Sequence, residues 1–239
     1  MNLSAAIELY GYGTSEGVTK AWDTRGRTGQ TNPPPQIPKE VYEDVDRYKA
    51  ILNDTAQRFK EAVGNYGMIE SRLKTPESLY EKMQRKGKTI DQVGDVIGMR
   101  VTTKDFQNLQ SAVEGIRKNF NVIKEDDKTK NPLGAYRAFH IDVDLGDGKR
   151  AEIQVRTENE SKMAGMMHDT IYKGGFKNNS YVNTYFLKLS NALYRMDRNM
   201  KAVLPKCPEP IKERVGCFEP AAGMKVAAAA SLFCWAERH

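Results

Sequence analysis

Two alternating segments joined by a glycine-rich turn constrain the fold more than any other feature of this sequence. Apolar and polar side chains alternate over residues 135–145 and again over 150–157, and Gly146-Asp147-Gly148 lies between the two segments. Strict alternation is typical of a strand with one buried face, and such a turn joins two strands into a hairpin. Residues 135–157 are therefore predicted to form a β-hairpin.

The predicted hairpin divides its side chains between an apolar face and a polar face, because successive strand residues point to opposite sides of a sheet. The apolar face carries Ile141, Val143, Leu145, Ala151, Ile153 and Val155. The polar face carries Tyr136, His140, Asp142, Glu152, Gln154 and Arg156. Such a face is either an ordinary solvated surface or the floor of a site for a metal or a phosphate. The hairpin alone leaves both interpretations open.

Periodicity elsewhere predicts helices that cover this sheet. From the helical spacing of apolar residues, helices are predicted over 39–65, 79–86, 105–119, 158–173 and 182–203. Ser78 is the predicted N-cap of the second of these helices. Further strands are predicted over 67–74 and 96–103, with a short extended segment at 122–123. This order predicts an α/β (α+β) fold with a mixed sheet of about five strands covered by helices.

Composition divides the chain into a leader, a body and a tail. Glycine and proline concentrate in residues 11–38, which is typical of a linker, and a short helix is expected before it, within residues 1–10. The body is predicted over 39–204, and a partly helical tail over 205–239. No segment has the ~20 apolar residues of a membrane-spanning helix, and the first residues do not resemble a secretory signal peptide. We therefore expect no membrane partner.

Charge and cysteine content narrow the function only slightly. The formal net charge is +6, and this mild basic excess is compatible with binding of phosphates without identifying a partner. The three cysteines, Cys207, Cys217 and Cys234, are far apart and lack the spacing of a zinc site. Reduced thiols are therefore expected.

A second polar group precedes the hairpin and is mostly cationic. Between residues 72 and 88 the cations are Arg72, Lys74, Lys82, Arg85, Lys86 and Lys88. A charge run is often only a solvated face. Here, however, Asp95 follows and leads into a predicted strand that carries Arg100. Clustered cations near isolated carboxylates are what phosphoryl transfer from a magnesium-bound nucleotide requires.

Taken in order, these segments resemble the motifs of RelA/SpoT-type alarmone synthetases. The similar segments are RLKTPESLYEK at 72–82 (R-x-K-x-x-x-S-x-x-x-K), DVIGMR at 95–100 (D-x-x-G-x-R), YRAFH at 136–140 (Y-R-S-L-H), EIQVRT at 152–157 (E-I-Q-I-R-T) and His168 with Tyr172-Lys173 (H-x-x-x-Y-K). One such motif is weak, whereas the ordered set over about residues 70–173 is specific. The resemblance implies the RelA/SpoT synthetase fold, which is nucleotidyltransferase-like.

The resemblance also implies a pyrophosphokinase, which moves the β,γ-pyrophosphate of ATP to the 3′-hydroxyl of an acceptor nucleotide. Asp95 and Glu152 would place Mg²⁺ and serve in catalysis, and Glu152 would also accept or polarise the hydroxyl proton. ATP would be bound by Arg72, Lys74, Ser78, Lys82 and Arg100, with the two arginines on the adenine. The acceptor would be bound by Lys130, Asn131, Tyr136, His140, Gln154, Arg156 and His168.

The segment just before Tyr136 departs from the family pattern. Members that accept guanine nucleotides usually carry K-x-N-G there, whereas this chain has Pro132-Leu133-Gly134-Ala135, with Lys130 and Asn131 just upstream. We therefore expect an adenosine nucleotide (AMP, ADP or ATP) as the acceptor and (p)ppApp as the product. Synthesis of (p)ppGpp from GDP or GTP, and pyrophosphorylation of a tRNA 3′ end, are the alternatives.

The resemblance extends to a biological role. Long members of the family also carry a His/Asp metal hydrolase, for which the three histidines of this sequence are too few. Unopposed synthesis after a linker-like leader resembles the toxin domain of a secreted interbacterial effector, such as a type VI effector. We expect it to deplete ATP in the cytoplasm of a target bacterium, with a cognate immunity protein as partner and no DNA partner.

A basic RNA-binding module is the non-enzymatic alternative. In that module the cations would bind phosphates and Tyr136 would stack on a base. Such a module has no need of Asp95 and Glu152 among its cations, because carboxylates repel phosphates unless a metal intervenes. Sensitivity of binding to EDTA separates the two hypotheses.

Overall fold

The computed structural model describes residues 36–172, 175, 176 and 178–220. The helix expected within residues 1–10, most of the linker, and a short helix expected at 226–230 lie outside these residues. The chain divides into two units, Met1–Glu40 and Val41–His239. The helices and strands described below belong to the second unit, except for the first two residues of the first helix. Within the described part of the chain, no helix has both the length and the apolar character needed to cross a membrane.

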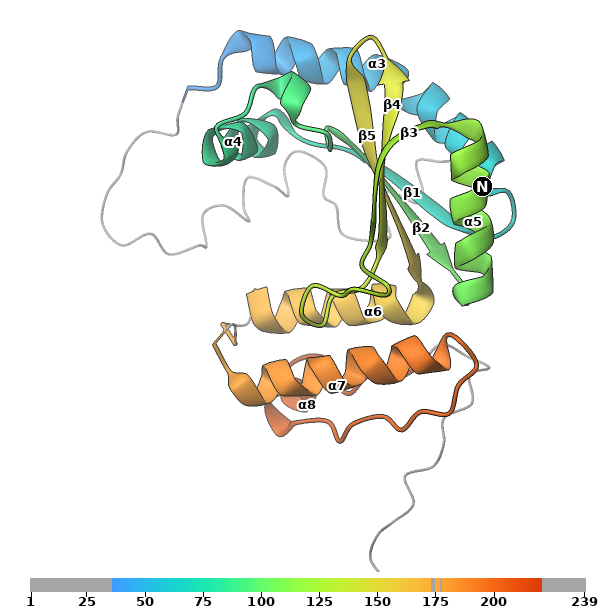
Figure 1. Ribbon diagram of the computed structural model, residues 1–239. Coiled ribbons are helices and arrows are strands. Elements are labelled where there is room, and N and C mark those ends of the chain that lie inside the picture. The colour runs from blue at the N-terminus through green and yellow to red at the C-terminus, as the bar shows by residue number, and fades with distance from the viewer. Residues whose placement is uncertain (1–35, 173–174, 177, 221–239) are drawn as a thin grey trace, which may run out of the picture. The chain divides into compact units, whose positions relative to one another are not determined.

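A mixed five-stranded sheet in the order β1-β2-β5-β4-β3 forms the centre of the second unit (Figure 1). Its strands are β1 (Gly67–Leu73), β2 (Ile97–Thr103), β3 (Asn121–Asp127), β4 (Phe139–Gly146) and β5 (Lys149–Thr157). β2 pairs with β5 in parallel, and the other neighbouring strands pair antiparallel. The predicted α/β (α+β) class and five-stranded mixed sheet are confirmed.

The hairpin of β4 and β5 forms as predicted, with Ile141 opposite Ile153. Asp147 in its turn has a positive φ of 51°, a conformation that aspartate tolerates better than most residues. β4 starts at Phe139 rather than at 135, because the backbones of Leu133 and Tyr136 bond to each other and close a separate turn. β3 extends over 121–127 rather than 122–123, since a charged edge strand shows no apolar alternation.

The described helices are α3 (Lys39–Val63), α4 (Pro76–Lys86), α5 (Phe106–Asn119), α6 (Glu158–Met167), α7 (Ser180–Met196) and α8 (Glu209–Val215), with a 3₁₀ turn at Ile90–Gln92 and a π-helical turn at His168–Tyr172. The predicted cap of α4 was wrong. Thr75 is the N-cap, and its hydroxyl accepts the backbone N–H of Ser78 at 3.3 Å. Proline is favoured in the first helical position that follows such a cap, so the helix starts at Pro76.

The C-terminal helices also differ from the prediction. The segment expected as one helix over 158–173 is α-helical only to Met167, and α7 ends at Met196 rather than near 203. The described part of the tail predicted after 205 contains the helix α8. Its Ile211 is fully buried, and Phe218 beyond it is 7% exposed.

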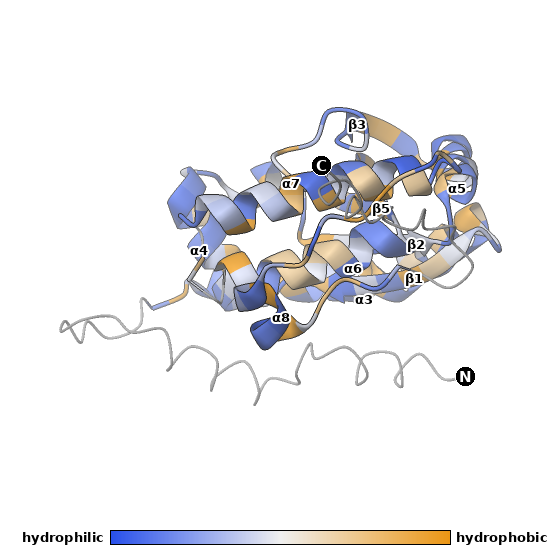
Figure 2. Ribbon diagram, turned by 90° about the horizontal axis from the view of Figure 1, so that it is seen from below, coloured by the Kyte–Doolittle hydropathy of each residue, from blue (hydrophilic) through white to orange (hydrophobic). Residues whose placement is uncertain are grey.

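Two apolar cores result from this arrangement. The apolar face of the sheet packs with α5, and α3 approaches α5 closely because Gly115 has no Cβ, which would overlap the carbonyl of Ala62. The second core lies among α6, α7 and α8. Its main buried residues are Met163, Phe186, Leu189, Leu193 and Ile211. Figure 2 shows α6 and α7 side by side, each with hydrophobic and hydrophilic residues along its length.

Two of the cysteines lie in this C-terminal region. Cys207 and Cys217 are free thiols, as expected, and Cys234 lies outside the described residues. Burial, with Cys217 nearby, raises the pKa of Cys207 to about 11.

Candidate active site

The polar face of the sheet carries the predicted site as two rows of cross-strand neighbours. From β1 to β3, the first row is Arg72, Gly98, Glu152, Asp142 and Lys124. The second row is Glu70, Arg100, Gln154, His140 and Asp126. Cross-strand neighbours on one face lie close enough for their side chains to interact. The register therefore brings the arginines of the proposed ATP site beside Glu152 and Gln154, which are more than 50 residues later in the chain.

Asp95 joins three elements at one end of the sheet. Its Oδ2 lies 2.5 Å from Nζ of Lys82 on α4 and 3.3 Å from Nζ of Lys74, the residue after β1. The backbone N–H of Lys74 donates to the carbonyl of Val96 at 2.9 Å, which positions this lysine beside the start of β2. Burial lowers the pKa of Lys74, while Asp95 opposes that shift. The other oxygen of Asp95, Oδ1, is buried and has no hydrogen-bond partner among the described residues.

Arg72 and Arg100 flank a glycine whose missing side chain leaves room on the face. A Cβ at Gly98 would lie 3.1 Å from Nε and 3.3 Å from Cγ of Arg72, which is tighter than ordinary packing. The Arg72 side chain therefore lies over β2 because position 98 is glycine. Arg100 donates from Nη1 to Oε2 of Glu70 at 3.4 Å. Arg72, Lys74, Lys82 and Arg100 are called the cationic group below.

On the other side of Glu152, five side chains form a closed hydrogen-bonded ring. Arg156 Nη2 donates to the hydroxyl of Tyr136 at 2.5 Å, and that hydroxyl lies 2.8 Å from Nε2 of His140. His140 Nδ1 lies 3.1 Å from Oε1 of Glu152, and Gln154 Nε2 donates to Oε2 of Glu152 at 3.0 Å. Arg156 Nη2 also donates to Oε1 of Gln154 at 2.6 Å, which closes the ring.

The ring has a consistent proton arrangement and holds Glu152 as an anion. The tyrosine hydroxyl accepts from Arg156 and can donate its own proton to Nε2 of His140, which leaves Nδ1 of that ring to donate to Glu152. The His140 hydrogen bond, opposed by burial and aided by Gln154, lowers the pKa of Glu152 to about 2. Burial raises the pKa of Tyr136, against the effect of Arg156.

Asp142 is an acidic neighbour to which the motifs assigned no role. It lies directly opposite Glu152 in the β4–β5 pairing, and strand alternation had already placed it on this face. Burial raises its pKa, and the negative charge of Glu152 adds to that shift. Like charges directly opposite one another destabilise a sheet, so the pair of Asp142 and Glu152 lowers its stability. Packing alone does not explain why the pair is there.

Four of the predicted residues belong neither to the cationic group around Asp95 nor to the ring. Ser78 is exposed in the first turn of α4, one helical turn before Lys82. Lys130 and Asn131 lie in the β3–β4 connection, where Lys130 is 67% exposed and 3.3 Å from Oδ2 of Asp127. His168 starts the π-helical turn and is 58% exposed. Their roles with nucleotides stay predictions.

The two predicted magnesium ligands fit an ion that is bound together with a nucleotide. Mg²⁺ is usually held by one or two carboxylates plus substrate phosphates. Asp95 offers a buried oxygen without a partner, and Glu152 is an anion. Within the described ranges, no group of three or more His, Cys, Asp or Glu could bind a metal unaided.

Comparison with known proteins agrees with this architecture. Residues 71–177 match the family model described as "Region found in RelA / SpoT proteins". A GTP pyrophosphokinase of Brucella ovis is 29% identical over 137 residues, a match that covers 55% of this chain and 18% of that relative. The chain thus spans about a fifth of the length of the curated relatives that it matches.

Solved structures show the same fold. Small alarmone synthetase 2 from Bacillus subtilis superposes with a TM-score of 0.58 at 21% identity, over 67% of this chain and 96% of that one. Small alarmone synthetase 1 from the same organism, bound to its product pppGpp, gives 0.56 at 21% identity, over 68% and 95%. Residues 71–177 of this chain therefore match the RelA/SpoT region, and the chain has the fold of the small alarmone synthetases.

Proposed function

We propose that this site transfers the β,γ-pyrophosphate of ATP to the 3′-hydroxyl of an acceptor nucleotide. The observation that carries the proposal is the position of Glu152. Its neighbour on β2 is Gly98, over which Arg72 lies, and its own carboxylate is part of the ring with Tyr136. One anionic carboxylate thus lies between a cationic group suited to a triphosphate and an aromatic ring suited to a second base.

Each residue has a role in this reaction that follows from its chemistry. Lys74 and Lys82, now on Asp95, would bind ATP phosphates, and the planar guanidinium groups of Arg72 and Arg100 would stack on adenine. The 3′-oxygen forms a bond to the β-phosphorus, and the bond from that phosphorus to the α–β bridging oxygen breaks. AMP leaves with the electron pair of that bond, and the hydroxyl proton is released to water. Mg²⁺, held by Asp95 and Glu152, would offset the charge of the phosphates.

Glu152 is better suited to orienting the acceptor than to storing its proton. A carboxylate with a pKa of about 2 is a weak base. It would therefore accept a hydrogen bond from the 3′-hydroxyl and direct its oxygen at the β-phosphorus. The ring keeps both carboxylate oxygens in fixed directions, because His140 and Gln154 each bond to one of them.

We further propose that the acceptor is an adenosine nucleotide, giving (p)ppApp. The turn before Tyr136 contains no polar side chain from 132 to 135, and Leu133 at its corner is 72% exposed. A site that reads guanine needs donors and acceptors for the base edge, and without them guanine loses its advantage. Of the two polar candidates just upstream, Lys130 and Asn131, the lysine is paired with Asp127.

A competition assay tests both proposals. The protein is incubated with labelled ATP, Mg²⁺ and equal concentrations of ADP and GDP, and the 3′-pyrophosphorylated products are resolved. Excess adenosine product is expected. Excess guanosine product would contradict the adenine preference, in line with the Brucella relative's name, and leave the pyrophosphokinase proposal standing. A tRNA arm tests pyrophosphorylation of the 3′ end, and EDTA-resistant RNA binding without transfer would favour the RNA-binding module.

The proposed product suggests a role as a toxin in the cytoplasm of a target bacterium. Each transfer consumes an ATP, and an adenosine acceptor draws on the same pool. We propose that such a chain acts with a cognate immunity protein that protects the producing cell. Expression in bacteria with measurement of ATP, ADP and (p)ppApp tests the role. Normal growth and unchanged pools with active protein would contradict it.

A further inference from the structure

We propose that Arg137 and Arg198 form an arginine clamp that positions the acceptor loop, residues 127–136, and with it the base-stacking Tyr136. The two arginines are therefore positioning residues that determine how tightly the acceptor nucleotide binds. The inference about the loop is structural, and its kinetic consequence rests on the proposed function.

The first part of the acceptor loop is a compact turn built on one carboxylate. Oδ1 of Asp127 accepts the backbone N–H of Thr129 at 3.0 Å, its hydroxyl at 2.6 Å and the backbone N–H of Lys130 at 3.3 Å. The backbone N–H of Asn131 donates to the carbonyl of Asp127 at 3.2 Å. Thr129 is fully buried, so the turn has a fixed underside.

Arg137 holds this turn against α7. Its Nη1 donates to the carbonyl of Thr129, its Nε donates to Oγ of Ser190 at 2.9 Å, and its Nη2 donates to Oδ1 of Asn191 at 2.8 Å. The residue is only 6% exposed. One rigid guanidinium thus joins the loop to two residues of α7, an arrangement that a lysine ammonium cannot reproduce.

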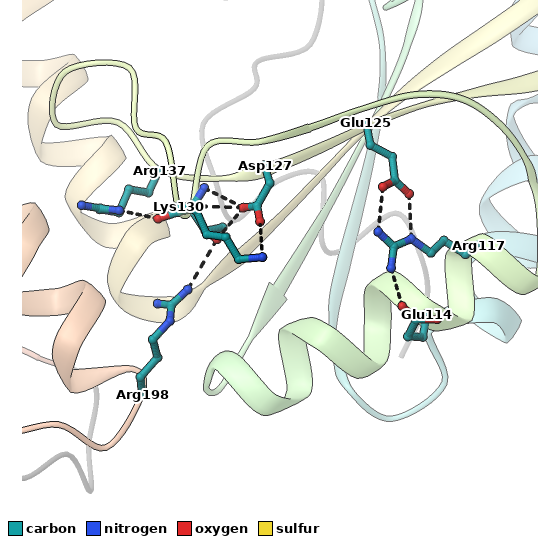
Figure 3. Close-up of polar contacts among 8 residues, drawn as sticks. Glu114, Arg117, Glu125, Asp127, Lys130, Arg137 and Arg198 are labelled. Atoms are coloured by element: carbon teal, nitrogen blue, oxygen red, sulfur yellow. Dashed lines mark hydrogen bonds and ion pairs between the residues drawn. The ribbon is translucent and has the colours of Figure 1, made fainter.

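Arg198, two residues beyond the C-terminal end of α7, reaches the same turn. Its guanidinium carbon lies 3.5 Å from the ring centroid of Phe106 on α5 and 3.6 Å from that of Tyr194, and its Nη2 is 3.5 Å from the hydroxyl of Thr129. Arg137 lies against the same Tyr194 ring at 4.5 Å. Figure 3 shows Arg137 and Arg198 approaching the loop that carries Asp127 and Lys130.

The clamp is placed to control Tyr136, which is adjacent in sequence to Arg137. Arg137 is bonded to α7, while the hydroxyl of Tyr136 belongs to the ring that contains Glu152. Ala135 packs into the core of α6, α7 and α8. Tyr136 therefore lies between two anchored neighbours, and a shift of the loop relative to α7 moves the stacking platform.

The clamp lowers folding stability, because it buries two positive charges. Burial lowers the pKa of Arg137 and of Arg198, and each positive charge disfavours the other. The hydrogen bonds of Arg137 go to neutral oxygens, so no direct ion pair offsets its burial. Glu160 opposes the pKa shift of Arg137, and Glu160, Asp197 and Asp127 oppose that of Arg198.

The test compares Arg137→Lys with a change at a second arginine that bonds to β3 but lies outside the acceptor loop. Arg117 on α5 also donates three hydrogen bonds, to Glu125 on β3 and to Glu114, but it is remote from the loop turn (Figure 3). Arg137→Lys is expected to raise the KM for the acceptor roughly tenfold, with the KM for ATP within about twofold. Arg117→Ala is expected to leave both values unchanged. Ser190→Ala, which removes one bond of the clamp, should have a smaller effect of the same kind.

Amide hydrogen exchange provides a readout that does not depend on activity. In Arg137→Lys the amides of residues 129–136 are expected to exchange faster, while those of β2 and β5 keep their protection. Unchanged exchange in the loop would overturn the clamp, and so would equal increases in the KM for ATP and for the acceptor. If the unaltered protein transfers no pyrophosphate, the proposed function fails, and the exchange comparison alone decides whether the clamp positions the loop.

Discussion

The two sides of Glu152 hold their polar groups by different physical means. On the β1–β2 side, charge holds the two lysines of the cationic group on one oxygen of Asp95, and Arg100 beside Glu70. On the β4–β5 side, the ring orients its members through directional hydrogen bonds that connect them all. The first side suits a ligand whose phosphates replace a carboxylate as partner of the lysines, and the second suits a base and a hydroxyl held in one orientation.

This difference predicts which side of Glu152 should tolerate substitutions. Ion pairs of partly exposed lysines have little geometric demand and weaken with salt. A closed hydrogen-bonded ring loses several contacts when one member moves, because a buried donor or acceptor left unpaired is costly. Substitutions on the two sides should therefore affect the protein in different ways.

The largest expected effect is at the residue shared by both sides. Glu152→Gln should lower the transfer rate by a factor of about 10² or more, because the anionic ligand and hydroxyl acceptor is lost. The fold should persist, since the change is isosteric on the sheet's polar face. Steady-state assays with circular dichroism on the same sample check this. Turnover near that of the unaltered protein would remove Glu152 from the reaction.

On the cationic side, Arg72→Ala and Arg100→Ala should each raise the KM for ATP by about 5- to 30-fold. A desolvated cation–π contact contributes on the order of 1–2 kcal/mol, and each variant removes one face of the adenine stack. The KM for the acceptor should change little. An increase confined to the acceptor's KM would show that the two sides are assigned the wrong way round.

On the ring side, His140→Ala should reduce the loss of stability in acid. The pKa of Glu152 is depressed from 4.5 to about 2 in the folded protein, so its contribution is present above pH 4.5 and is lost as the pH falls toward 2. Without His140, the largest cause of that shift, the loss over this window should shrink by on the order of 1–2 kcal/mol.

Chemical denaturation at pH values between 4.5 and 2.5 measures this effect. Other acidic groups with lowered pKa values, such as Glu125 and Asp127, titrate in both proteins and cancel in the comparison. Parallel curves for the unaltered protein and His140→Ala would show that the ring does not hold the charge of Glu152.

The smallest expected effect is that of Gly98→Ala, which reduces the space available to the Arg72 side chain without changing its charge. Gly98→Ala adds a methyl group that the Arg72 side chain must avoid by a few tenths of an ångström. The KM for ATP should rise about two- to threefold with little change in kcat, because Arg72 is flexible and keeps its charge. An unchanged KM for ATP, even in Gly98→Val, would show that the position of Arg72 over β2 is irrelevant to ATP.

Some features of the site could be predicted from sequence because they depend on local geometry. Alternation along β4 and β5 placed His140, Glu152, Gln154 and Arg156 on one face, and the pairing of His140 with Gln154 confirms it. The cap of α4 was misplaced because Thr75 and Ser78 are both good capping residues, and only the path of the chain after β1 selects between them. α8 was missed because seven residues with an early proline give little periodicity.

The sequence by itself determined the two-sided strands, the order of the elements and the identity of the chemical groups, since each follows from neighbours a few residues apart. Only the tertiary structure decided which groups meet. The five-strand register sets Arg72 and Arg100 beside β5, and the packing of α7 turns Arg137, the second residue of the Y-R-A-F-H segment, away from the site and into a buried clamp. Strand pairing and helix packing join residues that are tens of positions apart, and no local pattern encodes those distances.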